Sequence, residues 1–177
     1  VSNEIKQNEN DVSSLSNFQK IQQKALQVSL HIDLEERNLS GYVVGHYLRE
    51  DLEEKSLVLD SKNLNITGAF LVGGLDDSQL SRKLDFKVHT DHSLAKSLGT
   101  PLEIFLPLED LSKEEKDIFV KIEYSTTSKG EGIQWLEKHQ TLSKKYPFMF
   151  TQCEAILARS CLPCQDSPSA KVEFRRV

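Results

Sequence analysis

The chain has 177 residues, of which 38% are hydrophobic and 28% charged, and its formal net charge is −5. This length supports one globular domain with a real core, and this composition argues against wholesale disorder. A mildly acidic chain without Lys/Arg clusters among aromatic residues argues against nucleic-acid binding, and no apolar run approaches the roughly 20 residues of a membrane span.

The first seventeen residues are polar and low in aromatic side chains. They predict a flexible lead-in over residues 1–17 that is not part of the core, followed by the folded domain over residues 18–177. No charged-then-apolar leader follows Val1, so no secretion signal is visible. The three cysteines form an odd, clustered set that is a poor disulfide framework, which favours a reducing compartment. We therefore expect a cytoplasmic protein.

Strict alternation of apolar and other residues begins at residues 25–34. The apolar positions are Leu26, Val28, Leu30, Ile32 and Leu34. A period of two is typical of a strand with one buried face. The polar turn at residues 35–38 and the renewed alternation from Leu39 predict a second strand.

The same alternation recurs through the middle of the chain. It predicts strands at residues 57–59, 64–72, 84–88, 102–106 and 118–124. Ser112 and Glu115 could form a capping box on one short helical turn. Seven or more short strands without a long helical period predict an all-β domain, a saddle or sandwich of antiparallel sheets with at most short helical turns. Residues 170–177 alternate like a further strand without a closing turn, so we expect the natural polypeptide to continue.

Cys161 and Cys164 have the C-x-x-C spacing of zinc and dithiol sites. A structural zinc site needs four ligands, but Cys153 and His139 do not supply a second paired spacing. A redox motif belongs at a strand-to-helix turn of a βαβ unit, which the pattern does not predict. Ordinary buried thiols are therefore the favoured interpretation, and we expect no metal site on this chain.

Gln152 and Glu154 form a polar pair two positions apart, just after an apolar run. If residues 148–154 form a strand, these two side chains lie on one face and Cys153 lies on the other. Such a pair is most often a solvated face. Here an FMF run precedes the pair and a loop rich in Pro and Cys follows it, so this setting could present a carboxylate and an amide into a cleft.

The segment from Thr151 to Pro168 matches the loose pattern T-Q-x-E/Q-A/S-x-x-A-R-x-x-x-P-C-x-D-x-P. The matching residues are Thr151, Gln152, Glu154, Ala155, Ala158, Arg159, Pro163, Cys164, Asp166 and Pro168. This segment resembles the substrate-anchoring segment of the gluzincin aminopeptidases. The runs LVLD at 57–60, IQWL at 133–136 and QCEAI at 152–156 are most similar to the leukotriene-A hydrolase and aminopeptidase B branch. The likeness extends from about Phe18 to the end of the chain.

The resemblance implies an N-terminal saddle of antiparallel sheets packed on a separate catalytic domain. In that family the catalytic domain binds zinc through H-E-x-x-H and a distant Glu, and it carries a G-x-M-E-N loop. None of these motifs occurs in this sequence, so the resemblance places the zinc ligands elsewhere on the parent protein. We expect this chain alone to be inactive and to have the parent's own catalytic domain as a partner.

The resemblance also implies a peptide-binding site at Gln152, Cys153, Glu154 and Ala155, where the free N-terminus of the substrate is held. Leukotriene-A hydrolases commonly have Gln where Glu154 stands, and a carboxylate suits an amine better than a fatty-acid epoxide. We therefore expect the parent to be a zinc aminopeptidase and leave epoxide hydrolysis open. The alternative is a non-catalytic β-sandwich module that binds other proteins.

Overall fold

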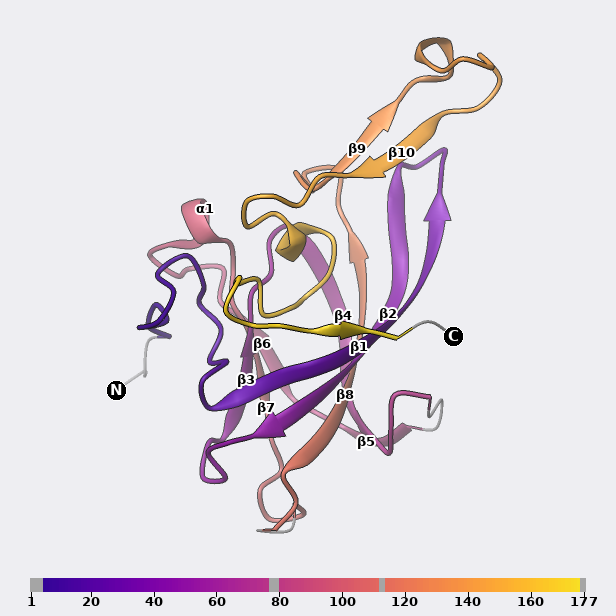
Figure 1. Cartoon of the computed structure of the whole chain (residues 1–177). Coiled ribbons are helices and arrows are strands. Elements are labelled where there is room, and N and C mark those ends of the chain that lie inside the picture. Colours follow the sequence, from indigo (N-terminus) through magenta and orange to yellow (C-terminus); the bar gives the residue numbers. More distant parts are fainter. Residues whose placement is uncertain (1–4, 77–79, 112–113, 176–177) are drawn as a thin grey trace.

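A six-stranded sheet forms the centre of the computed structural model, which describes residues 5–76, 80–111 and 114–175 (Figure 1). In spatial order its strands are β11 (Glu173–Phe174), β1 (Ile21–Asp33), β2 (Asn38–Arg49), β8 (Asp117–Thr126), β4 (Leu64–Val72) and β5 (Leu80–Lys83). The strands pair antiparallel, apart from β11, which runs parallel to β1. The long β1–β2 hairpin and β8 make up most of this surface (Figure 1).

Two smaller sheets and three short helical turns complete the described part of the fold. The smaller sheets are β3 (Ser56–Leu59), β7 (Leu102–Phe105) and β6 (Phe86–Val88), and the hairpin of β9 (Ile133–Leu136) and β10 (Phe148–Thr151). The turns are α1 (Ala95–Leu98), η1 (Lys138–Gln140) and η2 (Ala158–Ser160). The hairpin extends away from the rest of the molecule, at the top of Figure 1.

The core lies between the six-stranded sheet and the three-stranded sheet. Every second residue of β8 from Ile118 onward is buried, as the alternation of its apolar residues predicts. These side chains pack against β2 and against the small sheet. The core residues of these strands are Val43, Tyr47, Leu57, Leu59, Leu102, Ile104, Ile118, Val120, Ile122 and Tyr124. The predicted all-β saddle or sandwich of antiparallel sheets is thereby confirmed.

Several boundaries differ from the prediction. The strand expected at residues 84–88 is shorter, since β6 begins at Phe86 and the N–H of the buried Leu84 donates to the carbonyl of Ala69 at 2.8 Å. Only residues 173 and 174 of the expected C-terminal strand pair with β1, and residues 176–177 lie outside the described residues. The expected capping box includes Ser112, which also lies outside them. Strand β5 was not predicted.

The lead-in predicted at residues 1–17 is partly wrong, because its second half belongs to the core. Leu15 is only 1% exposed, and Asn8, Ser14 and Ser16 are buried beside it. The Ser14 hydroxyl donates to the buried carboxylate of Asp60 at 2.6 Å. A polar segment can enter an interior when its polar groups find partners there, and composition does not reveal such partners.

Candidate functional site

The β9–β10 hairpin carries the start of the candidate site. Its strands pair from Phe148 opposite Leu136 to Thr151 opposite Ile133. One face of the hairpin contributes Trp135 and Met149 to a small apolar cluster around Leu39, Ile133 and Cys161. On the other face, the rings of Phe148 and Phe150 stack with their centroids 6.2 Å apart. One side of the hairpin is therefore fastened to the domain, and the other presents aromatic surface.

The strand expected at residues 148–154 is wrong in its last part, because β10 ends at Thr151. The N–H of Gln152 makes a last bond to the carbonyl of Gly132 at 2.9 Å. The chain then turns, and the N–H of Leu157 donates to the carbonyl of Cys153 at 2.9 Å. This turn explains why alternation stops at Gln152. The pair Gln152 and Glu154 sits on a loop instead of on one face of a strand.

The loop nonetheless leaves three of the four expected residues accessible and partly buries the fourth. Gln152, Glu154 and Ala155 are exposed, whereas Cys153 is half-buried and packs into the apolar cluster beneath the hairpin. The Cys153 and Cys161 sulfurs lie 3.7 Å apart. The Glu154 carboxylate accepts no hydrogen bond and forms no ion pair with any residue that the structure describes. It is therefore available to an external cation.

A glycine holds the loop against β9. The Gly132 N–H donates to the Ser160 hydroxyl oxygen at 2.8 Å, and the Ser160 hydroxyl donates to the carbonyl of Leu157 at 2.7 Å. A Cβ at position 132 would lie 2.6 Å from that carbonyl oxygen and 2.8 Å from the Cys161 sulfur. Only glycine lets the two backbones approach this closely. The role of Gly132 was not predicted, although a glycine just before a short strand is a usable signal of close backbone approach.

Arg159 lies at the centre of a buried polar cluster behind the loop, and it is 0% exposed. Its Nε donates to the Asp166 carboxylate at 2.9 Å, and its Nη1 donates to the Leu98 carbonyl at 2.7 Å. Its Nη2 donates to the carbonyls of Ser13 and Asp166 at 2.9 and 3.0 Å. A second carboxylate, that of Asp60, lies 3.6 Å from Nη1. The guanidinium therefore joins four separate parts of the chain.

Asp60 supplies the other half of this cluster. Its carboxylate accepts hydrogen bonds from the Ser14 hydroxyl, from the Leu15 N–H at 2.7 Å and from the Asp166 N–H at 3.1 Å. Burial raises the pKa of Asp60 above its ordinary value, and the neighbouring Arg159 guanidinium and these hydrogen bonds oppose the rise. No role was predicted for Asp60 or Arg159. Both lay within the quoted matches, but charged residues give no pattern that distinguishes a buried position from an exposed one.

Cys161 and Cys164 are buried thiols, as predicted. Burial and the neighbouring Cys153 raise the pKa of Cys161 to about 12, and burial raises the pKa of Cys164 well above its usual range. Among the described residues, no group of three or more His, Cys, Asp or Glu side chains is placed to hold a metal ion. No helix in the described part of the chain is long and apolar enough to cross a membrane.

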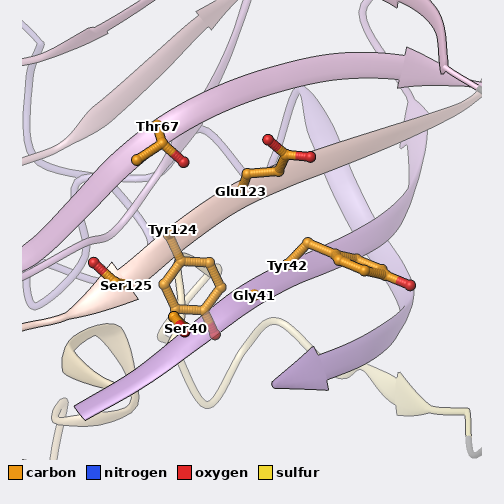
Figure 2. Close-up of a pocket in the computed structure, with 7 residues that line it drawn as sticks. All are labelled: Ser40, Gly41, Tyr42, Thr67, Glu123, Tyr124 and Ser125. Atoms are coloured by element: carbon orange, nitrogen blue, oxygen red, sulfur yellow. The ribbon is translucent and has the colours of Figure 1, made fainter. Parts of the chain in front are cut away.

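A concavity lies away from the expected site, over the large sheet near the start of β2 and the end of β8. Figure 2 shows its lining, which includes Tyr42 from β2, Glu123 from β8 and Thr67 from β4, around a volume of about 410 Å³. The Lys121 amine sits 4.3 Å above the Tyr42 ring and 3.3 Å from the Glu123 carboxylate. The charges at this concavity are therefore already paired within the sheet, and none of the four expected site residues lines it.

Comparison with known proteins places the chain in a family. Residues 22–176 match the Peptidase M1 N-terminal domain. The chain belongs to this family. A leukotriene A-4 hydrolase from Xenopus laevis is 36% identical to this M1 N-terminal domain over 166 residues, which are 93% of the chain and 25% of the relative. A leucine aminopeptidase 2 from Yarrowia lipolytica is 37% identical over 166 residues, which are 94% of the chain and 23% of the relative.

The fold is shared with a solved relative. The structure of native yeast LTA4 hydrolase matches this M1 N-terminal domain with a TM-score of 0.77 and 28% sequence identity, covering 98% of this chain and 24% of that chain. The chain thus spans about a quarter of the length of the relatives that it matches.

Proposed function

We propose that this M1 N-terminal domain anchors peptide substrates for a zinc aminopeptidase, and that Glu154 binds the free α-amine of the substrate. The single observation that supports this role is the state of the Glu154 carboxylate. It is exposed and unpaired among the described residues, on a turn whose flanks are fixed by Gly132 and Leu157. A fixed and unsatisfied anion is what an exopeptidase needs in order to recognise a chain end.

The strength of this contact depends on what covers it. An ion pair in open water contributes little, typically about 0–1 kcal/mol. A charge-assisted hydrogen bond in a partly dry cleft contributes roughly 1.5–3 kcal/mol. We therefore propose that the cleft is completed by the remainder of the parent, with Glu154 on one wall and the exposed Gln152 and Ala155 beside it.

The exposed face of the hairpin supports a contact with that remainder. Phe148 and Tyr146 are exposed, and Leu142 projects fully into solvent at the hairpin end. This apolar surface leads along β10 directly into the candidate loop. Exposed apolar patches that adjoin polar sites commonly mark interfaces. We propose that the catalytic domain of the parent packs against this face.

Zinc belongs to the parent and not to this chain in the proposal. The described residues offer no ligand set that fits the ion, so its ligands would lie on the part of the parent beyond this domain. In a zinc peptidase the metal polarises the scissile carbonyl and activates water. Glu154 would hold the substrate and transfer no proton.

Aminopeptidase activity is favoured over epoxide hydrolysis by the identity of the side chain. A carboxylate complements an ammonium group, whereas a fatty-acid epoxide carries no positive charge near its reacting carbons. The matched relatives include proteins named for each activity. We place the parent in the cytoplasm, because three clustered cysteines suit a reducing compartment.

The test is Glu154→Gln in the full-length parent. We expect KM for peptides with a free α-amine to rise about tenfold or more, since the charged partner of the amine is lost. Inhibition constants of desamino analogues of the same peptides should not change. Glu36→Gln is the matched control, because Glu36 is also exposed and its carboxylate has no partner among the described residues. An unchanged KM in Glu154→Gln would favour the alternative, a protein-binding module.

A further inference from the structure

We infer that Arg159, with its acceptors Asp60 and Asp166, is a positioning residue that holds the Gln152–Ala155 loop in its binding conformation. This inference rests on the proposed function of that loop. Arg159 touches none of the four expected site residues through a hydrogen bond. Its influence must therefore pass through the intervening backbone.

Arg159 fixes the η2 turn. Arg159 lies within the η2 turn, and its own N–H donates to the Asp166 carboxylate at 3.2 Å. Together with the four side-chain bonds, this ties both its backbone and its guanidinium to Ser13, Leu98 and Asp166. The N–H of Lys62 also donates to its carbonyl at 2.9 Å. The η2 turn therefore has little freedom to move.

Hydrogen bonds connect the η2 turn to the loop. Ser160, the next residue, binds the Gly132 N–H and the Leu157 carbonyl through its hydroxyl. The carbonyl of Gly132 accepts from Gln152, and the N–H of Leu157 donates to Cys153. Hydrogen bonds to groups that the η2 turn positions therefore hold both ends of the loop. Each link is a hydrogen bond of 2.7 to 2.9 Å.

The arrangement of acceptors around residue 159 suits arginine. A guanidinium presents five N–H donors in a rigid planar fork, and here they serve three carbonyls and a carboxylate. A lysine has the same charge but only three donors on a flexible stem, so it cannot reach all of these acceptors together. Arg159→Lys therefore preserves the positive charge beside Asp60 and Asp166 but loses the planar set of hydrogen bonds that the guanidinium makes.

A matched control distinguishes positioning from plain stability. Arg49 is likewise buried, and its guanidinium donates to the carbonyls of Glu115 and Leu52 at 3.0 and 2.6 Å. It ends β2, whereas Leu39, near the other end of that strand, packs under the β9–β10 hairpin. At about 3.3 Å per strand residue, the two ends are roughly 33 Å apart. Arg49→Lys should destabilise the domain without reaching the loop.

The experiment is a mutant cycle in the full-length parent, with KM, kcat and Tm measured on a free-amine peptide. The variants are Arg159→Lys, Glu154→Gln, the double variant and Arg49→Lys. We expect Arg159→Lys to raise KM about fivefold with kcat within about twofold, because a displaced anchor weakens binding of substrate. In the Glu154→Gln background, Arg159→Lys should raise KM little further, since the substrate contact of Glu154 that Arg159 positions is already lost. Arg49→Lys should lower Tm with KM unchanged.

The KM values of these variants distinguish failure of the positioning role of Arg159 from failure of the binding role of Glu154. If Arg159→Lys lowers Tm but leaves KM unchanged, or raises KM equally in both backgrounds, the inference is wrong while the role of Glu154 stands. If Glu154→Gln alone leaves KM unchanged, the proposed function and the inference both fail. Should Arg159→Lys not fold, Asp166→Ala gives the same readout, because it removes the carboxylate oxygen that accepts from both the backbone N–H and the Nε of Arg159.

Discussion

The large sheet and the candidate loop are held in place by different kinds of interaction. Strands β1, β2 and β8 form ladders between neighbours, and in β8 the buried residues recur at every second position. The loop has no such repeat. It depends on a charged cluster whose partners lie far apart in sequence, up to 146 residues between Arg159 and Ser13. The position of each strand is therefore encoded in its local sequence, whereas the loop is positioned by contacts between distant parts of the chain.

The largest expected effect of this difference comes from Asp60→Ala. Removing the Asp60 carboxylate leaves the buried Ser14 hydroxyl and the N–H groups of Leu15 and Asp166 without an acceptor. Each unsatisfied buried group costs about 1–3 kcal/mol of folding free energy. We expect the loss of hydrogen-exchange protection to concentrate in residues 8–17 and 152–166. Ile122→Ala is the control from the sheet, with a comparable cost of about 2–5 kcal/mol. It should lower protection across the whole domain, and identical patterns for the two variants would contradict the comparison.

The sequence predicts these two regions unequally. Alternation was enough to place β1, β2, β4 and β8, because apolar period two depends only on residues next to one another. It failed at Gln152, where a turn that depends on Gly132 replaces the strand. It also left Leu15 outside the core, since the buried Asp60 that draws that segment inward is 45 residues away. The residue pattern itself suggested Gln152 and Glu154 as a polar pair, whereas their peptide-binding role and the inclusion of Cys153 and Ala155 came from a family resemblance.

A smaller effect is expected from Gly132→Ala. The added methyl group would meet the backbone carbonyl of Leu157 at 2.6 Å, so the loop and β9 must separate. Overpacking of this kind costs about 1–3 kcal/mol. KM for free-amine peptides should rise in the full-length protein, whereas Gly74→Ala should leave KM and Tm unchanged, because nothing lies within 4 Å of a Cβ at that position. A neutral Gly132→Ala would show that the loop is not fixed by this contact.

The smallest effect concerns the thiols beneath the loop. Because the pKa of Cys161 is raised to about 12, its thiolate stays a minority species throughout the neutral and mildly alkaline range. Its alkylation rate by iodoacetamide in the folded protein should rise about tenfold per pH unit from pH 7 to 10. Mass spectrometry of the labelled peptide measures this rate, with the urea-unfolded protein as control. A rate that levels off near pH 9 would show an ordinary thiol.

The most direct measurement is a structure of the full-length parent with a bound peptide that has a free N-terminus. The account predicts the peptide ammonium within about 3 Å of a Glu154 carboxylate oxygen, in a cleft closed by the rest of the protein. A peptide amine bound by other groups, with the carboxyl of residue 154 left in bulk water, would contradict it.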